Sequence, residues 1–258
     1  MKLSIVVPAY NEEKRIGRML DAYLPYFAER YGDDFEMVVS INHSRDRTEE
    51  IVKEHARRHP QLRAVVDPNP IGKGGAIMAG GKVARGRLVG FVDADGATPP
   101  EAFDELVANI GDAGLIIASR RLPGAVVRPR QAWRRRVASR AFNVLVRVLF
   151  KIRITDTQCG AKLMTAEAWH AIVPHIGLTR WAFDVDMIFK TRRAGHRIAE
   201  IPTTWRDVGD SKLRVGAVSL QMLLAIVRLR LLYSPLSWVV RLYDRLLGRV
   251  IVLDVATR

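Results

Sequence analysis

Residues 3–8 decide how the fold begins, because they read Leu3-Ser4-Ile5-Val6-Val7-Pro8, a short β-branched run that ends at a proline. The run is too short for the apolar core of a secretory signal peptide, and it indicates a buried strand. Four similar runs follow, separated by stretches with helical spacing. Strands are expected at residues 3–7, 36–41, 63–66, 88–92 and 115–118, and helices at 12–30, 46–59, 76–84 and 100–110. This alternation predicts an α/β fold, with a mainly parallel, Rossmann-like sheet flanked by helices.

The composition of the 258 residues is that of a globular protein, with 48% hydrophobic and 26% charged side chains. A single cysteine, Cys159, excludes a disulfide framework and every multi-cysteine metal site, and it predicts a reducing compartment. Lysine and arginine number 41 against 27 acidic residues, a net charge of +14, so the partners should be anionic. Only 7% of residues are aromatic and no nucleic-acid-binding module is recognisable, which argues against a nucleic-acid partner.

The second half of the chain carries most of the unbalanced charge. Residues 120–153 contain eleven basic residues and no acidic one, and beyond Ser211 apolar clusters alternate with arginines. The longest uncharged run there, 215–227, is shorter than the roughly 18 residues that a membrane span needs. Two interpretations stay open for this end: amphipathic helices in the membrane interface, or helices that pack on the core. We expect one domain over 1–210 and an amphipathic helical extension over 211–258.

The clearest chemical motif is Asp93-Ala94-Asp95, directly after the apolar strand at 88–92. Two carboxylates spaced in this way at a strand end can share Mg²⁺ or Mn²⁺ with a diphosphate. Lys73 lies in Gly72-Lys73-Gly74-Gly75, which we expect to form a flexible loop where backbone could approach a nucleotide. The spacing is not that of a Walker A motif.

Several motifs together resemble a known family. They are Ile5-Val6-Val7-Pro8-Ala9-Tyr10-Asn11-Glu12, Asp93-Ala94-Asp95-Gly96-Ala97-Thr98, Asp156-Thr157-Gln158-Cys159-Gly160 and Arg206-Asp207-Val208-Gly209-Asp210-Ser211-Lys212. Their order and spacing resemble the family-two inverting glycosyltransferases with a GT-A fold, over about residues 3–233. Within that family they are most similar to the dolichyl- or polyprenyl-phosphate hexose synthases, and especially to the dolichyl-phosphate β-glucosyltransferase branch.

The resemblance implies a donor site. Its nucleoside pocket would be formed by Pro8, Tyr10, Asn11, Glu12 and Asn42, and its diphosphate region by Lys73, Asp93, Ala94, Asp95, Arg206, Ser211 and Lys212. Asn42 stands where the family usually has a carboxylate, which leaves UDP-glucose and GDP-mannose both open as donors. Ala97 stands where mannosyl members often carry glutamine, and this favours glucose.

The resemblance also implies an acceptor site. Arg120, Arg135 and Ser139 would hold the phosphate of the lipid acceptor, since the planar guanidinium binds phosphate oxygens in pairs. Asp156 and Gln158 would orient the sugar or the acceptor, while Asp93 and Asp95 would hold the metal.

The function implied is transfer of a hexose, glucose in preference to mannose, from a nucleotide diphosphate sugar to dolichyl or polyprenyl phosphate. We expect a protein attached peripherally to the cytoplasmic face of a membrane, with Mg²⁺ or Mn²⁺ as cofactor. Transfer to a hydroxyl of a polysaccharide or protein glycan is the alternative, and it would need a carboxylate base such as Asp156 or Asp186. A non-catalytic basic protein that binds membrane or nucleic acid is a further alternative.

Overall fold

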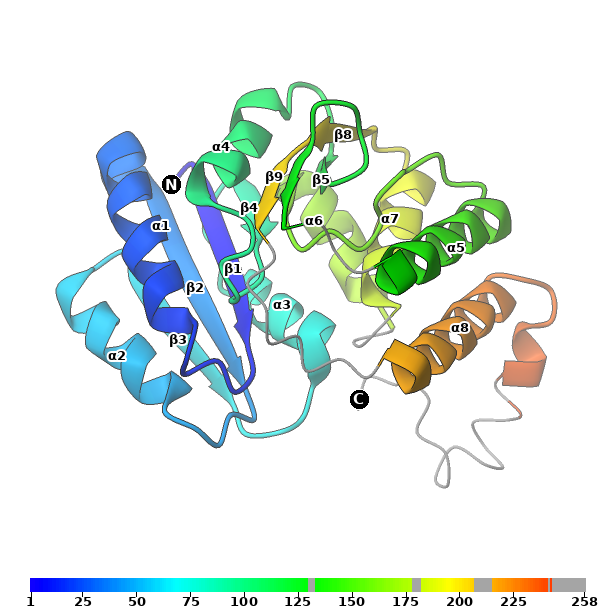
Figure 1. Ribbon diagram of the computed structural model, residues 1–258, viewed down its shortest axis with the longest axis horizontal. Helices are drawn as coiled ribbons and strands as arrows, with labels where there is room; N and C mark the ends of the chain where they lie inside the picture. The colour runs from blue at the N-terminus through cyan, green and yellow to red at the C-terminus, as the bar shows by residue number, and fades with distance from the viewer. Residues whose placement is uncertain (130–132, 178–181, 207–214, 241, 243–258) are drawn as a thin grey trace.

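The computed structural model describes residues 1–129, 133–177, 182–206, 215–240 and 242, and a seven-stranded sheet runs through it (Figure 1). The strand order is β3-β2-β1-β4-β7-β5-β8. The strands are β1 (Leu3–Ala9), β2 (Phe35–Asn42), β3 (Leu62–Asp67), β4 (Leu88–Phe91), β5 (Leu115–Ser119), β7 (Lys162–Thr165) and β8 (Ile198–Pro202). Only β7 runs antiparallel to its neighbours, β4 and β5, among these strands. A second sheet pairs β6 (Val126–Arg128) with β9 (Thr204–Arg206) in parallel.

Helices cover both faces of the large sheet. They are α1 (Ile16–Tyr31), α2 (Thr48–Arg58), α3 (Gly72–Lys82), α4 (Pro100–Asn109), α5 (Trp133–Phe150), α6 (Ala166–Ile172), α7 (Phe183–Arg193) and α8 (Val215–Leu232), with short 3-10 helices at Gly32–Asp34 and Val173–His175. The expected α/β fold with a mainly parallel sheet flanked by helices is confirmed.

The strands separate two hydrophobic cores, because successive side chains point to opposite faces of a sheet. On β1, Leu3 and Ile5 face a core that includes α1 and α4, whereas Val6 faces a core that includes α3 and α5–α8. Strands that are buried on both faces read as continuous apolar runs, which is why their positions could be predicted.

The third helix begins four residues earlier than expected, at Gly72 instead of residue 76. The expectation of a flexible loop at 72–75 is therefore wrong, because these residues form the first turn of α3. Their glycines permit close packing: a Cβ on Gly74 would overlap the ring of Phe183, and one on Gly80 would overlap Val6. Contacts of this kind override the low intrinsic helix propensity of glycine.

The last described helix, α8, packs against the body of the molecule. Its Ala225, Ile226 and Leu229 are buried in the second core, and the hydroxyl of Tyr233 donates to Asp186 Oδ1 at 2.6 Å. Within the described part of the chain, no helix combines the length and the apolar character needed to cross a bilayer.

Candidate functional site

The candidate site lies at the carboxyl ends of the parallel strands, where ligands bind in open α/β sheets. Tyr10 follows β1, Asn42 ends β2, and Asp93 and Asp95 follow β4. Because β1 pairs with both β2 and β4, these three strand ends are neighbours in the sheet. The structure therefore brings together the donor residues that the sequence places in three separate segments.

Asp93 is paired with the lysine of α3. The Nζ atom of Lys73 lies 2.5 Å from Asp93 Oδ1. Burial lowers the pKa of Lys73, but the charges of Asp93 and Asp184 outweigh this and raise it above its usual value. Lys73 is therefore a fixed positive charge beside the carboxylate pair.

Asp95 is held by the turn that follows it, since its Oδ1 accepts a hydrogen bond from the backbone nitrogen of Ala97 at 2.9 Å. Burial raises the pKa of Asp95, and the negative charge of Asp93 raises it further. The negative charge of Asp93 beside the buried carboxylate of Asp95 favours a cation between the two side chains.

The second motif packs directly against the first. A Cβ on Gly160 would overlap the carboxylate of Asp93, so only glycine allows the loop at 156–160 to come this close. This close contact with Asp93 explains why the motif Asp156–Gly160 ends in glycine.

The carboxylate pair fits a divalent metal with a mixed ligand set. Asp93 and Asp95 supply hard oxygen atoms, and no group of three or more His, Cys, Asp or Glu side chains suited to a metal occurs in the described ranges. Mg²⁺ typically takes one or two carboxylates from the protein and completes its shell with substrate phosphates and water. Asp93 and Asp95 match this pattern.

The loop after β1 is tied to the loop after β2. The backbone nitrogen of Asn11 donates to Ser44 Oγ at 3.0 Å, and Asn11 Oδ1 accepts from the nitrogen of Arg45 at 2.8 Å. The backbone nitrogen of Glu12 donates to Thr48 Oγ1 at 2.7 Å. These bonds leave the ring of Tyr10 exposed at the rim, where it can pack against a nucleoside base.

Asn42 is buried and part of its side chain is already engaged. Its Oδ1 accepts a hydrogen bond from the backbone nitrogen of Ile71 at 3.0 Å, which orders the residues before α3. An aspartate at this position could make the same bond. Asn42 differs by having an amide group that can donate to a ligand.

Pro8, the remaining residue expected in the nucleoside pocket, lies within β1 and is half-buried.

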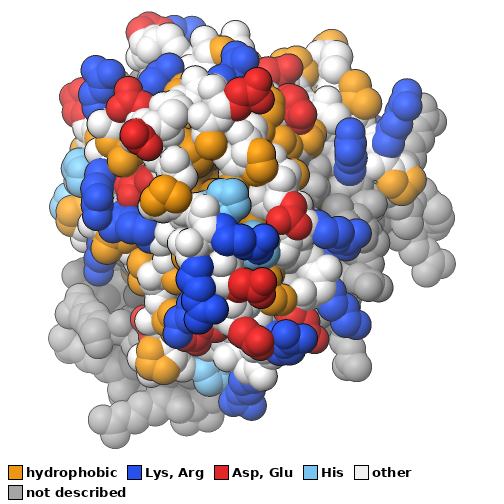
Figure 2. All heavy atoms as spheres, turned by 90° about the vertical axis from the view of Figure 1, so that its left-hand side faces the viewer, with side chains coloured by type: hydrophobic (Ala, Val, Ile, Leu, Met, Phe, Trp, Pro, Cys, Tyr) orange, Lys and Arg blue, Asp and Glu red, His pale blue; other side chains and the backbone are white. Residues whose placement is uncertain are grey.

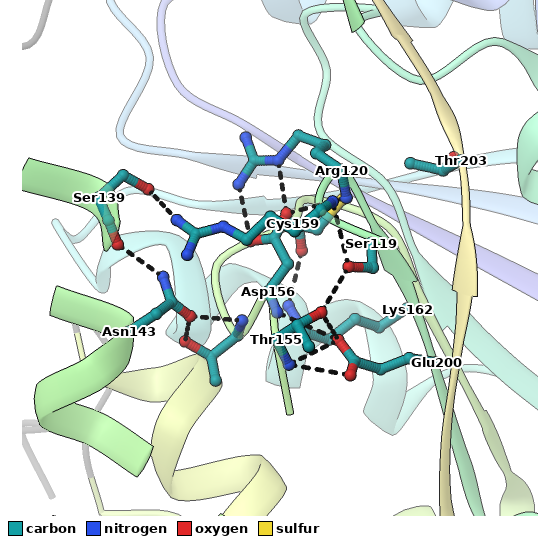
Figure 3. A network of polar contacts seen from close by, with 12 residues as sticks. Ser119, Arg120, Ser139, Asn143, Thr155, Asp156, Cys159, Lys162, Glu200 and Thr203 are labelled. Atoms are coloured by element: carbon teal, nitrogen blue, oxygen red, sulfur yellow. Dashed lines mark hydrogen bonds and ion pairs between the residues drawn. The ribbon is translucent and has the colours of Figure 1, made fainter. Parts of the chain in front are cut away.

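A second set of charged groups lies at the end of β5 (Figure 3). We call Arg120, Arg121, Ser139 and Asp156 the anion cluster. Arg120 donates from Nε to Asp156 Oδ2 at 2.7 Å and from Nη2 to Oδ1 at 2.9 Å. Burial raises the pKa of Asp156, but the charge and hydrogen bonds of Arg120 outweigh it, so the pKa is lower than usual. Asp156 is therefore a weak base whose two oxygens are both engaged.

Arg121 is the member of the anion cluster that the sequence reasoning missed. Its Nη2 donates to Ser139 Oγ at 2.6 Å, and it forms no ion pair with a carboxylate in the described part of the chain. Burial lowers the pKa of Arg121, and the positive charges of Arg120 and Arg140 lower it further against the opposing effect of Asp156. A half-buried cation with these surroundings is suited to binding an anion. In the sequence, Arg121 could have been identified from its position beside Arg120 in a segment that contains no acidic residue.

The loop that carries Asp156 is held from two sides (Figure 3). Glu200 on β8 accepts from the backbone nitrogen of Thr155 at 2.9 Å and from that of Asp156 at 3.1 Å. On α5, Asn143 Oδ1 accepts from the backbone nitrogen of Thr157 at 3.1 Å. The Nε2 atom of Gln158 is buried without a hydrogen-bond partner in the described structure, which suits a donor that awaits a ligand.

Arg206 is joined to the metal motif through its backbone. Its nitrogen donates to the carbonyl oxygen of Ala97 at 2.7 Å, and its side chain is exposed. Ser211 and Lys212 lie outside the described residues. Arg135 is part of α5, one turn before Ser139, but its side chain is likewise outside the described part.

Asp186, the other candidate for an alternative base, and its neighbour Asp184 are both engaged in other contacts. Asp184 forms a buried ion pair with Lys162 at 2.6 Å. Asp186 accepts from Lys190 at 2.8 Å and from Tyr233. Asp184 and Asp186 are therefore structural residues of α7.

The chain was compared with known proteins. Residues 4–172 match the model of "Glycosyl transferase family 2". The dolichyl-phosphate beta-glucosyltransferase ALG5C of Trichomonas vaginalis is 33% identical over 248 residues, which is 92% of this chain and 73% of that protein. The human dolichyl-phosphate beta-glucosyltransferase is 32% identical over 250 residues, 92% of this chain and 77% of its own length.

Among solved structures, glucosyl-3-phosphoglycerate synthase from Mycobacterium tuberculosis, in complex with Mn²⁺, uridine diphosphate and phosphoglyceric acid, superposes with a TM-score of 0.67. The alignment covers 89% of this chain and 78% of that one at 20% identity, and it confirms the GT-A type of fold. The family model matches more than half of the chain, and the two alignments cover about three quarters of each relative's own length. The chain therefore belongs to glycosyl transferase family 2 and is a glycosyltransferase.

Proposed function

We propose that this enzyme transfers glucose from a nucleotide diphosphate sugar to the phosphate of a dolichyl or polyprenyl lipid at the cytoplasmic face of a membrane. The names of the relatives that match nearly the whole chain support glucose as the sugar and dolichyl phosphate as the acceptor. UDP-glucose is the first donor to test, with GDP-mannose as the competing candidate.

One observation carries the choice of a phosphate acceptor over a hydroxyl acceptor. Beside the metal motif lies a set of cations that includes Arg121, while the carboxylate within that set, Asp156, has both oxygens bound to Arg120. A hydroxyl acceptor needs a base to remove its proton, and a carboxylate with a lowered pKa is poorly suited to that task. A phosphate is already anionic at neutral pH and needs only to be bound and oriented.

In the proposed reaction an oxygen of the acceptor phosphate attacks the anomeric carbon from the face opposite the diphosphate. The new bond joins that oxygen to the sugar, and the bond from the anomeric carbon to the diphosphate breaks, so the configuration inverts. No proton has to be transferred. Catalysis then depends on orientation and on cations that stabilise negative charge.

The residues of the candidate site have distinct roles in the proposed reaction. Asp93 and Asp95 would hold Mg²⁺ or Mn²⁺, which supplies charge neutralisation for the departing diphosphate. Lys73 adds a fixed positive charge beside them. Arg121 and Ser139 would bind the acceptor phosphate, and Arg120 would be oriented for the same task by Asp156. Arg135, Arg206, Ser211 and Lys212 remain expected ligands, Arg135 for the acceptor and the others for the donor diphosphate.

The test measures transfer from UDP-glucose and GDP-mannose to a polyprenyl phosphate, with Arg121→Ala as the diagnostic variant. Loss of a charge-assisted hydrogen bond of about 1.5–3 kcal/mol should raise the acceptor KM by roughly 10- to 100-fold, with donor affinity unchanged. Arg128→Ala, an exposed arginine on β6, is the matched control and should keep both constants. Weakened donor binding with an unchanged acceptor constant would place Arg121 at the diphosphate. Transfer to sugar hydroxyls but not to prenyl phosphate would contradict the proposal.

A further inference from the structure

Lys162 places an ammonium group in the middle of the large sheet. It lies on β7, between β4 and β5, and its side chain is fully buried. Its Nζ atom donates to Asp184 Oδ1 and to the carbonyl oxygen of Cys159, both at 2.6 Å. The same atom lies 5.3 Å from the centroid of the Phe91 ring. A charge in an apolar interior is stable only when it has partners of this kind.

The pair of Lys162 and Asp184 differs from the ion pairs at the surface. Figure 2 shows acidic and basic side chains interspersed on the face formed by α1 and α2. There Lys53 and Glu49 are 58% and 41% exposed, so their pair is solvated and contributes little to stability. Lys162 and Asp184 are 0% and 8% exposed. Apolar side chains in place of a buried pair often leave stability unchanged or raise it, so stability alone does not account for these two charges.

A first connection to the metal motif runs through the loop at 156–160, which Lys162 holds at Cys159 (Figure 3). The next residue, Gly160, lies so close to Asp93 that a Cβ would overlap its carboxylate. The hydrogen bond of the ammonium group is therefore one residue away from this contact. Without that bond the end of the loop could move, and Asp93 would lose the surface that limits the orientation of its carboxylate.

A second connection runs through Asp184 to the lysine that pairs with Asp93. Burial lowers the pKa of Lys73, whereas the charge of Asp93 and next that of Asp184 raise it above its usual value. Asp184 on α7 therefore acts on a side chain of α3. The first turns of these helices touch, since a Cβ on Gly74 would overlap the ring of Phe183. The buried ammonium group of β7 balances Asp184, so that Lys73 stays paired with Asp93 at 2.5 Å.

We propose that Lys162 is a positioning residue for the divalent metal. Through the loop at 156–160 and through Asp184, it orients the carboxylate of Asp93. This role rests on the proposed function, in which Asp93 and Asp95 hold the metal. A carboxylate that is oriented before the metal arrives loses less conformational freedom on binding, and this raises the metal affinity.

The test is a titration of Mn²⁺, without nucleotide or acceptor, on the variant Lys162→Met/Asp184→Asn. The two substitutions remove one charge of each sign, so the net charge near the metal motif is unchanged and no buried charge is left without a partner. The dissociation constant for Mn²⁺ should rise by about 10- to 100-fold, as is typical when a group that orients a metal ligand is lost.

The matched control is Lys190→Met/Asp186→Asn. It removes a pair of the same two residue types on α7, at 2.8 Å and with 13% and 1% exposure, that is bonded to Tyr233. This variant should keep the Mn²⁺ dissociation constant of the parent protein. Urea unfolding checks that both double variants are folded under the conditions of the titration.

Amide hydrogen exchange of the parent protein tests the same connection without a substitution. If opening of the loop at 156–160 disturbs Asp93, the metal binds only the closed form. Mn²⁺ at about 100 times its dissociation constant should then slow exchange in the loop by roughly 100-fold, as it should at residues 93–97.

Equal losses of Mn²⁺ affinity in the two double variants would overturn the proposal, because general destabilisation would then be the cause. So would loop exchange that Mn²⁺ leaves unchanged while residues 93–97 are protected. The variant Asp93→Asn separates this outcome from a failure of the proposed function. If it loses Mn²⁺ binding and Lys162→Met/Asp184→Asn does not, Lys162 is purely structural and the metal site stands. Unchanged Mn²⁺ binding in Asp93→Asn would contradict the metal site itself, and the role of Lys162 with it.

Discussion

Arg120 and Asp156 show how a single pair of residues orders the proposed acceptor side of the site. The guanidinium makes two side-chain hydrogen bonds to the carboxylate, and its backbone nitrogen donates to Oδ2 at 3.1 Å. The carboxylate is almost fully buried. Removing one partner of a buried pair leaves the other charge uncompensated, which costs more than the pair itself contributes.

Asp156→Asn should therefore lower the free energy of unfolding at pH 7 by on the order of 3 kcal/mol. Since the folded pKa of Asp156 is below its unfolded value of about 3.9, this contribution is fully present above about pH 5. It is lost as the pH falls through the folded pKa, so the curves of the variant and the parent protein should converge in acid. Urea unfolding at several pH values measures the difference. Asp112→Asn, which removes an exposed pair with Arg197, is the control and should show no such convergence.

Gly160 provides a second test at the same scale. In Gly160→Ala the new Cβ would displace the Asp93 carboxylate or the loop, at a cost of about 1–3 kcal/mol in stability. Because Asp93 would be moved, Mn²⁺ affinity should fall by about 10-fold or more. Gly177→Ala is the matched control, since a Cβ there meets no atom within 4 Å. Unchanged Mn²⁺ binding in Gly160→Ala would mean that Asp93 does not hold the metal.

Individual residues differed in how far the sequence could predict them. Asp93 and Asp95 follow an apolar strand, so their place at a sheet edge could be inferred from local pattern alone. The contact between Gly160 and Asp93 joins segments 67 positions apart, and Arg121 gains its role only from its neighbours Arg140 and Ser139 in space. Properties that depend on such distant contacts have no local signal.

The elements of secondary structure show a similar division. The apolar runs at β1, β2, β4 and β5 could be predicted because buried parallel strands are largely apolar. The edge strand β3 is mostly half-buried, and its position was indicated by the β-branched pair Val65 and Val66. The antiparallel strand β7 was not predicted, since Lys162–Thr165 is short and begins with a lysine that is buried against Asp184. The start of α3 was predicted four residues too late, because glycine has a low helix propensity. The close packing of these glycines, which offsets that propensity, has no signal in the local sequence.

The first turn of α3 has a functional consequence that can be tested. In Lys73→Met the carboxylate of Asp93 loses its ion-pair partner, so Mn²⁺ in the absence of nucleotide should bind roughly fivefold more tightly. UDP should bind more weakly, because we propose that Lys73 faces the diphosphate and its positive charge is removed. Lys82→Met, at the last turn of the same helix, carries the same charge change and should alter neither constant. Titrations of Mn²⁺ and UDP measure the two effects, and a loss of both affinities would show that Lys73 helps to hold the metal instead of competing with it.

At the scale of the whole molecule, the sheet and its two cores connect the proposed donor and acceptor sites. The first core fixes β1 and β2 at the proposed donor side, and the second fixes α5, which carries Ser139 of the anion cluster. The second core also includes α8, from the segment expected as an amphipathic extension. One side of that helix is buried, while Leu223, Leu224 and Val227 are exposed. The same helix therefore packs on the body with one side and exposes apolar side chains on the other.

The buried and exposed sides of α8 predict different results for the same substitution at two positions of the helix. Leu229 is 1% exposed and Leu223 is 40% exposed, so Leu→Ala changes helix propensity equally at both positions but removes core packing at only one. Leu229→Ala should lower the free energy of unfolding by about 2–5 kcal/mol, whereas Leu223→Ala should change it by less than about 1 kcal/mol. Thermal and urea unfolding of the full chain measure both. If α8 folds with the body, the loss in Leu229→Ala should shift one cooperative transition in which the sheet and helices melt together. A separate early transition in that variant, with the main transition unmoved, would show instead that residues 215–232 form an independent unit whose contact with the second core contributes little to the stability of the enzyme.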